Sequence, residues 1–289
     1  MIEQKYNDLK LGERGAILSI FTYISLSIIK LIVAYMTDST ALKADGLNNT
    51  TDIIASIAVF IGLKLSQRPP DKDHSYGHWK SETIASMVAS FIMISVGLQV
   101  LIDAFSSLFE GRKGSPDIMA AYVGVFSALV MYCVYLYNKK LADRINSKSV
   151  MAAAKDNLSD AWVSIGTAIG IFASQLSMPW LDTITAIIVG LLICKTAWDI
   201  FKEASHELSD GFDEEKLQFY QEVIRKVNGV KGIKEIKGRN YGNNVVIDVV
   251  ILVNSKLGIT EAHDIATYVE KVMIEDYGIY DVHVHVEPN

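Results

Sequence analysis

The chain has 289 residues, of which 50% are hydrophobic and 21% charged, and its formal net charge is −6. The acidic balance argues against nucleic acid as the main partner, because surfaces that bind nucleic acid are basic. A mean hydropathy of +0.25 is high for a soluble protein and modest for a purely membrane one. The average conceals a division, since residues up to about 205 form apolar runs while the rest are charged and typical of a soluble domain.

Six apolar runs are long enough to cross a bilayer, which takes about 20 residues. We expect spans at 13–36, 40–64, 82–108, 116–138, 148–175 and 180–203. Basic residues gather before the first span, between spans two and three, and between spans four and five. The positive-inside rule therefore predicts that both termini are cytoplasmic. Cys133 and Cys194 lie in apolar runs, and we expect buried free thiols there.

Two of the spans carry polar pairs at helical spacing. Asp45 and Asn49 lie four residues apart in the second span, and Asp156 and Asp160 lie four apart in the fifth. Positions i and i+4 share one face of a helix. An Asp at the centre of a membrane helix costs roughly 2.5 to 3.5 kcal/mol, so such residues usually mark an ion pathway. Two facing helices would then form a cation site made of four oxygen ligands.

Two features of this site, and one charged residue elsewhere in the spans, stay open at the level of sequence. Asp52 follows Asn49 by three residues and could be the fourth ligand instead, or a proton acceptor. Asp45 lies near the outer end of its span, whereas Asp156 lies about two turns from the inner end of its own, so their depths do not match. Lys30 lies deep in the first span and needs a partner that the sequence does not identify.

The soluble tail alternates between helical and strand patterns. Residues 213–227 and 259–275 have helical spacing, whereas 232–237, 245–253 and 281–287 are typical of strands. Residues 241–244 are expected to form a hairpin turn. The order is α-β-β-α-β, a small two-layer α/β unit.

These features together resemble the cation diffusion facilitators, which exchange divalent metals for protons. The resemblance rests on the paired polar residues, on the Asp71-x-x-His74-x-x-x-His78 loop and on the α-β-β-α-β tail. It implies an α-helical membrane protein: six transmembrane helices in residues 1–207, followed by a cytoplasmic ferredoxin-like domain in residues 208–289 that regulates and dimerises. The implied partners are a second copy of the chain, the lipid bilayer, divalent metal ions and protons.

The resemblance also implies which residues bind metal. The family's transport site maps onto Asp45, Asn49, Asp156 and Asp160, with Asp156 where zinc-selective members have His. This set looks like that of the manganese-transporting branch, and carboxylate and amide oxygens do suit Mn²⁺. An all-oxygen site does not by itself exclude Zn²⁺ or Fe²⁺, because Mn²⁺ is low in the Irving–Williams order.

Two further sites are expected from the family. The loop residues Asp71, His74 and His78 can hold another metal, although a merely solvated loop is an equal alternative. In the tail the remaining candidate ligands are His263, His283, His285 and Glu287. Lys234 and Val250 stand where zinc-type members have His, which predicts a reduced or displaced tail site.

We expect a homodimeric secondary transporter that exports Mn²⁺ from the cytoplasm in exchange for protons. A zinc or iron exporter of the same family and a membrane metal sensor without flux are the alternatives. An intramembrane metalloenzyme is disfavoured because it would normally need metal-binding His, and no span contains one. We therefore expect no catalytic residue and no catalytic cofactor. The compact chain, without His-rich inserts or targeting segments, suggests a bacterial plasma membrane.

Overall fold

The structure is a computed structural model that describes every residue except 1, 67, 110–114, 146–147, 177 and 242–243. The chain divides into two compact units. The first comprises Met1–Ile57 and Ala89–Asp199, and the second comprises Ala58–Val88 and Ile200–Asn289. Three long helices cross from one unit to the other, so the units are joined by continuous helical backbone.

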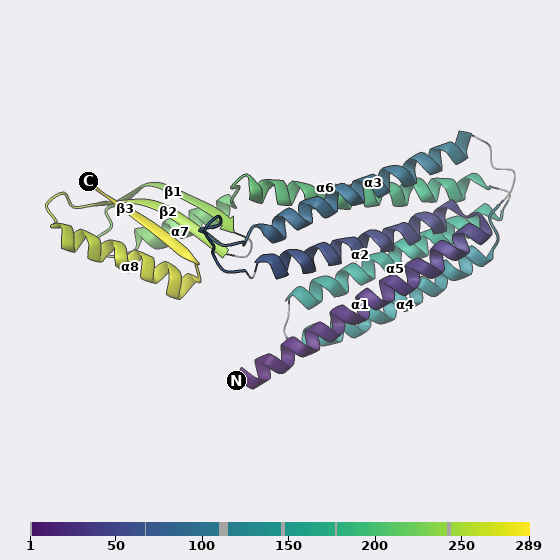
Figure 1. Ribbon diagram of the computed structural model, residues 1–289, viewed down its shortest axis with the longest axis horizontal. Coiled ribbons are helices and arrows are strands. Elements are labelled where there is room, and N and C mark those ends of the chain that lie inside the picture. The colour runs from purple at the N-terminus through teal and green to yellow at the C-terminus, as the bar shows by residue number, and fades with distance from the viewer. Residues whose placement is uncertain (1, 67, 110–114, 146–147, 177, 242–243) are drawn as a thin grey trace. The chain divides into compact units, whose positions relative to one another are not determined.

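Six long helices make up the first two thirds of the chain (Figure 1). They are α1 (Ile2–Thr37), α2 (Thr40–Ser66), α3 (Ser81–Phe109), α4 (Met119–Ile145), α5 (Lys148–Ser174) and α6 (Trp180–Leu208). Within the described residues, all but α5 contain a segment long and apolar enough to cross a membrane. The first half of α5 carries Lys155, Asp156 and Asp160, which lowers its apolar character. The six predicted helices are confirmed, but α1 begins at Ile2 where the span was expected to begin at residue 13, and α4 continues to Ile145 where the span was expected to end at residue 138.

Small residues allow the helices of the first unit to pack closely. A Cβ on Gly124 of α4 would lie 3.1 Å from the Ala168 Cβ of α5, and one on Gly97 of α3 would lie 2.6 Å from the Cys194 Sγ of α6. Such contacts are typical of helix pairs in membranes. Both cysteines are free, but the prediction that both are buried is wrong, because Cys133 is exposed and Cys194 only half-buried. An apolar run does not distinguish a lipid-facing position from an interior one.

The tail folds as predicted into an α-β-β-α-β unit. Its elements are α7 (Glu214–Arg225), β1 (Gly232–Tyr241), β2 (Asn244–Val253), α8 (Ile259–Tyr277) and β3 (Asp281–Pro288). The central strand β2 pairs antiparallel with β1 and parallel with β3. Val282 and Val284 of β3 pack with Ile247 and Val249 of β2 into a core beneath the helices, so the alternate residues of β3 face the other way. The expected turn residues Gly242 and Asn243 lie outside the described residues.

A buried carboxylate secures the start of α2. Asp182, near the start of α6, is fully buried. It accepts hydrogen bonds from the Ser39 hydroxyl at 2.6 Å, and from the Thr40 backbone N–H and hydroxyl at 2.9 and 2.7 Å. It therefore satisfies donors at the first turn of α2, as an N-cap would, but from another helix. This fixes α2 upstream of Asp45.

Replacing Asp182 should destabilise the helical unit. Loss of several hydrogen bonds to a buried charged group should cost about 2 kcal/mol or more, and Asp182→Ala should cost more than Asp182→Asn, which keeps one acceptor. Thermal unfolding of the purified protein would measure the loss. Asp103→Asn is the matched control, because Asp103 pairs with the half-exposed Lys43 of α2 at 2.5 Å and such pairs contribute little. Equal losses in both variants would contradict this role for Asp182.

Candidate metal centre

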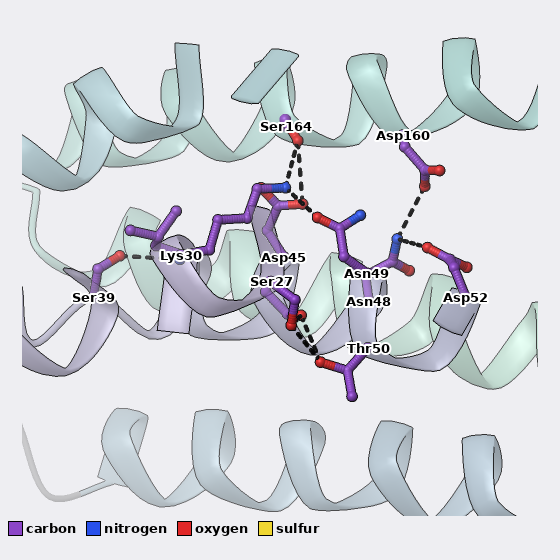
Figure 2. A network of polar contacts seen from close by, with 12 residues as sticks. Ser27, Lys30, Ser39, Asp45, Asn48, Asn49, Thr50, Asp52, Asp160 and Ser164 are labelled. Carbon is purple, nitrogen blue, oxygen red and sulfur yellow. Dashed lines mark hydrogen bonds and ion pairs between the residues drawn. The ribbon is translucent and has the colours of Figure 1, made fainter. Parts of the chain in front are cut away.

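A lysine and an aspartate form an ion pair at the centre of the first unit. Asp45 and Asn49 lie one turn apart on α2, and both side chains are fully buried. The Lys30 ammonium on α1, also fully buried, lies 2.9 Å from Asp45 Oδ2 and donates to Asn49 Oδ1 at 2.7 Å (Figure 2). The charge partner that Lys30 requires is therefore Asp45.

Gly46 allows α1 to reach this pair. A Cβ at position 46 would lie 3.0 Å from Leu31 and 3.2 Å from the Lys30 Cβ, so a larger residue would force the helices apart. The buried Ser27 hydroxyl of α1 donates a hydrogen bond to the Gly46 carbonyl over 3.1 Å. The close approach places the Lys30 stem beside Asp45, where the ammonium can reach both α2 ligands.

Ser164 of α5 completes the polar surroundings of Lys30. Its hydroxyl lies 2.9 Å from the Lys30 Nζ and 3.3 Å from Asp45 Oδ1. Ser164 is fully buried and lies one turn beyond Asp160 on the same helix. The fifth helix thus presents a hydroxyl, rather than a carboxylate, opposite Asp45.

Asp160 belongs to a neighbouring group of side chains. Its Oδ2 accepts from the Tyr23 hydroxyl at 2.6 Å, and its Oδ1 accepts from Asn48 Nδ2 at 3.1 Å. The same Asn48 nitrogen lies 3.5 Å from Asp52 Oδ2 (Figure 2). Asn48 therefore joins the carboxylates of Asp52 and Asp160. Four residues of α2 form a polar stripe that meets α5 at Asp160 and Ser164: Asp45, Asn48, Asn49 and Asp52.

Buried amides hold Tyr23 and Asp160 in place. Asn157 donates to the Tyr23 hydroxyl at 3.0 Å, and Asn138 of α4 donates to Asn157 at 2.9 Å. Ser19 of α1 bonds to Asn157 at 3.1 Å. This network ties three helices together around the Asp160 carboxylate. Partners of this kind orient ligands and are as important to a metal site as the ligands themselves.

Three of the four predicted ligands are buried in this region, and the fourth is not. Asp156 lies one turn before Asp160 on α5, and its side chain is exposed. Because α2 and α5 run in opposite directions, Asp45 faces Ser164, the Asn48–Asp52 turn faces Asp160, and Asp156 lies further along in the direction of the α2 C-terminus. The mismatch in depth expected from the sequence is thus present in this conformation.

The loop between α2 and α3 brings its three candidate ligands together. Asp71 Oδ1 lies 3.1 Å from His74 Nδ1, and Asp71 Oδ2 lies 3.4 Å from His78 Nε2. Among the described residues, this is the one group of three or more histidines, cysteines and acids whose ligand atoms all lie within 4.8 Å of one another. The His74 backbone N–H donates to Asp71, which lowers the pKa of that carboxyl and keeps it ionised.

The same loop packs on the tail sheet within the second unit. Tyr76 stacks on Tyr241 at the end of β1, with ring centroids 5.9 Å apart, and Trp79 meets Tyr280 edge-on at 5.6 Å. Lys80 lies 2.8 Å from Asp210, in the turn after α6. The loop cluster is therefore connected to the sheet by two aromatic contacts and an ion pair.

The candidate tail ligands are dispersed. His283 lies 3.0 Å from Asp248 and 3.4 Å from Asp281, beside a surface hollow of about 280 Å³ that His285 also lines. Glu287 is engaged by Lys234, whose Nζ lies 2.6 Å from Oε2. His263 is an exposed residue of α8, which packs on the opposite face of the sheet. His285 Nε2 lies 3.9 Å from Glu287 Oε1, but among the described residues of one chain the four candidates do not gather into a single metal-binding group.

Comparisons with known proteins agree with this architecture. The profile described as "Cation efflux transmembrane domain" matches residues 16–209, and that described as "Cation efflux protein, cytoplasmic domain" matches residues 196–289. The manganese efflux system protein MneS of Bacillus subtilis (strain 168) is 55% identical over 285 residues, covering 99% of this chain and 98% of MneS.

Two other Bacillus subtilis proteins align over nearly their whole length. The uncharacterized transporter YdbO is 50% identical, covering 99% of each chain, and the manganese efflux system protein MneP is 28% identical, covering 96% of this chain and 97% of MneP. Six long helices with a buried polar stripe, an α-β-β-α-β tail and two profile matches that together span residues 16–289 lead to one assignment. The chain is a membrane protein of the cation diffusion facilitator family of cation efflux proteins.

Proposed function

We propose that this protein exports Mn²⁺ from the cytoplasm in exchange for protons. The observation that carries the proposal is the polar stripe of α2, in which Asp45 and Asn49 are fully buried and Asn48 contacts Asp160 of α5, in a family of cation efflux proteins. Two of the related proteins are named as manganese efflux systems. Asp45, Asn49, Asp156 and Asp160 are the proposed ligands, with Asp52 as a neighbouring acceptor.

The ligand chemistry favours Mn²⁺ over Zn²⁺. Carboxylate and amide oxygens suit Mn²⁺, whereas imidazole suits Zn²⁺, and no described side chain within hydrogen-bonding distance of Asp45 or Asp160 is a histidine. Affinity alone would still favour the later metals of the Irving–Williams series. Selectivity must then come from the geometry of the site and from the abundance of the metal in the cell.

Exchange for protons follows from the ligands. A carboxylate binds metal only when it is deprotonated, so loading the site releases protons and unloading it allows protons to return. For the site to fill, Asp160 must be released from Tyr23 and Asn48, which bind it in the present conformation, and the exposed side chain of Asp156 must turn towards α2. The movement of α5 against α2 that this requires also provides alternating access to the two sides of the membrane.

The proposed setting is a bacterial plasma membrane, with both termini and the tail domain, residues 208–289, in the cytoplasm. The basic residues between the helices support this orientation. We further propose that the protein is a homodimer joined through its cytoplasmic domain, since the tail belongs to the family's cytoplasmic domain. A mass of one chain for the purified protein at micromolar concentration would contradict the dimer.

Asp160→Ala should abolish transport. Proteoliposomes with an imposed pH gradient and a trapped pH-sensitive dye should show Mn²⁺ movement coupled to opposite proton movement in the wild type. Loss of a residue that only orients a metal ligand can reduce activity by about a hundredfold. Removal of the ligand Asp160 itself should reduce the transport rate by at least as much. Asp103→Asn, outside the site, should retain the wild-type rate. Full transport by Asp160→Ala would exclude this site, and metal binding by the wild type without flux would favour a sensor.

Asp156→His should shift selectivity towards Zn²⁺. An imidazole at this position supplies the nitrogen ligand that Zn²⁺ prefers, so the ratio of Zn²⁺ to Mn²⁺ flux should rise by about tenfold or more. Asp156→Asn, which keeps an oxygen ligand, is the matched control and should not raise the ratio. If the wild-type protein transported Zn²⁺ or Fe²⁺ faster than Mn²⁺, the family assignment would stand and the proposal that Mn²⁺ is the transported metal would be wrong.

We also propose that the loop residues Asp71, His74 and His78 bind a regulatory divalent ion. The cluster is preformed, and the contacts of Tyr76 and Trp79 would convey its occupancy to the tail sheet. A tail site at His283 and His285 is a further proposal. It would recruit His263 only from a second copy of the chain, and Glu287 only after Lys234 moves away.

His74→Ala should remove one bound metal ion per chain and leave the maximum transport rate unchanged. The pKa of the Asp71 carboxyl is lowered by the hydrogen bond from the His74 backbone N–H, so Asp71 should remain ionised and able to bind metal in mildly acidic solution. Equilibrium dialysis of the full chain would give the stoichiometry, with His206→Ala as the control. If His74→Ala bound as many metal ions per chain as the wild type, the three loop residues would not form a metal site and the loop would simply be solvated.

A further inference from the structure

We propose that the Lys30 ammonium is a tethered cation that occupies the transport site in its empty state and that the transported metal must displace. This inference rests on the proposed function, since it assigns a role to Lys30 within the same site. Lys30 is not one of the ligands expected from the sequence. Its role follows from where its ammonium lies.

The ammonium contacts the same atoms that a metal ion would use. Its two α2 partners are Asp45 Oδ2 at 2.9 Å and Asn49 Oδ1 at 2.7 Å, which are the oxygen atoms that these residues would offer to a cation (Figure 2). Its third partner is the Ser164 hydroxyl at 2.9 Å, on the helix that carries the other two proposed ligands. A divalent ion cannot share these oxygens with the ammonium at such distances, so the two cations exclude each other.

The pair is sealed from its surroundings, which makes the competition strong. Lys30, Asp45 and Asn49 are each fully buried. Electrostatic repulsion between an ammonium and a divalent ion a few ångströms apart is large where solvent is excluded. Gly46 and Ser27 hold α1 against this turn of α2, so the ammonium is presented to the site by the backbone packing.

The tethered cation also explains how an empty site can remain inside the membrane. Without metal, Asp45 would be an uncompensated charge among apolar helices, which is unfavourable. Lys30 neutralises it, so the empty transporter can return between its two conformations with this pair buried. The same ammonium lowers the affinity for the metal and thereby assists its release. We therefore expect Lys30 to lower the affinity of the site for the metal and to raise the rate of transport.

The test is Mn²⁺ binding and transport by Lys30→Met in the full-length protein. Free Mn²⁺ is measured by its paramagnetic resonance signal, and binding at other sites is measured in an Asp45→Asn, Asp160→Asn double variant and subtracted. Lys30→Met should bind Mn²⁺ about tenfold more tightly or better, because the competing charge is gone. In proteoliposomes its KM for Mn²⁺ should fall together with its maximum rate, a combination that mere loss of structure would not produce.

Lys43→Met is the matched control. Lys43 is a residue of α2 and also pairs with a carboxylate, that of Asp103, but this pair is half-exposed and lies outside the site. Its Kd and rate should equal those of the wild type. Lys30→Gln, which keeps a hydrogen-bonding end without charge, provides the same test if Lys30→Met does not fold.

Unchanged or weaker Mn²⁺ binding in a folded Lys30 variant would overturn the proposal and reduce Lys30 to a structural partner of Asp45. That outcome differs from failure of the proposed function, in which the wild-type protein itself would carry no Mn²⁺. A wild type that transports Mn²⁺, with Lys30 variants that bind it no more tightly, would reject the tethered cation alone.

Discussion

The buried ion pair between Lys30 and Asp45 is the constraint on which the helical unit depends. Each partner alone would be unfavourable among apolar helices, and together they are stable only because Asn49 and Ser164 satisfy the remaining bonds of the ammonium. Three helices must therefore meet at one point. Gly46 permits the close approach of α1 to α2 at this point, and the Asp182 carboxylate holds the first turn of α2 just before it.

The contents of the candidate site could be predicted from the sequence, but its register could not. Helical spacing placed Asp45, Asn49, Asp156 and Asp160 on the faces of two helices, because that spacing is a local property of the chain. Which turn of α5 faces which turn of α2 depends on packing between distant segments. Nothing local marks Ser164 as the residue opposite Asp45, so neither this contact nor the Lys30 partner could be predicted. An unpaired intramembrane lysine was the one available signal.

The tail shows the same division between local and distant information. Alternating and helical patterns predicted the α-β-β-α-β order, and the core valines and isoleucines of β2 and β3 do face the helices. The strand β1 extends to Tyr241, beyond the expected end at residue 237, because pairing with β2 continues through residues of weak strand pattern. The contacts of Tyr76 with Tyr241 and of Trp79 with Tyr280 join segments far apart in sequence, and single aromatic residues in loops do not identify such partners.

The division into two units gives the proposed regulation a physical route. The second unit contains not only the tail but also residues 58–88, which include the end of α2, the loop with Asp71, and the start of α3. The first unit contains the part of α2 that carries Asp45 to Asp52. The helix that carries the polar stripe, α2, ends at Ser66, five residues before Asp71 in the sequence. Under the proposed regulation, a change that metal binding imposed on the loop would act on α2, which precedes the loop in the chain, whereas α5, which carries Asp156 and Asp160, lies wholly in the first unit. A movement of α2 relative to α5 is the change that would assemble or separate the four proposed ligands.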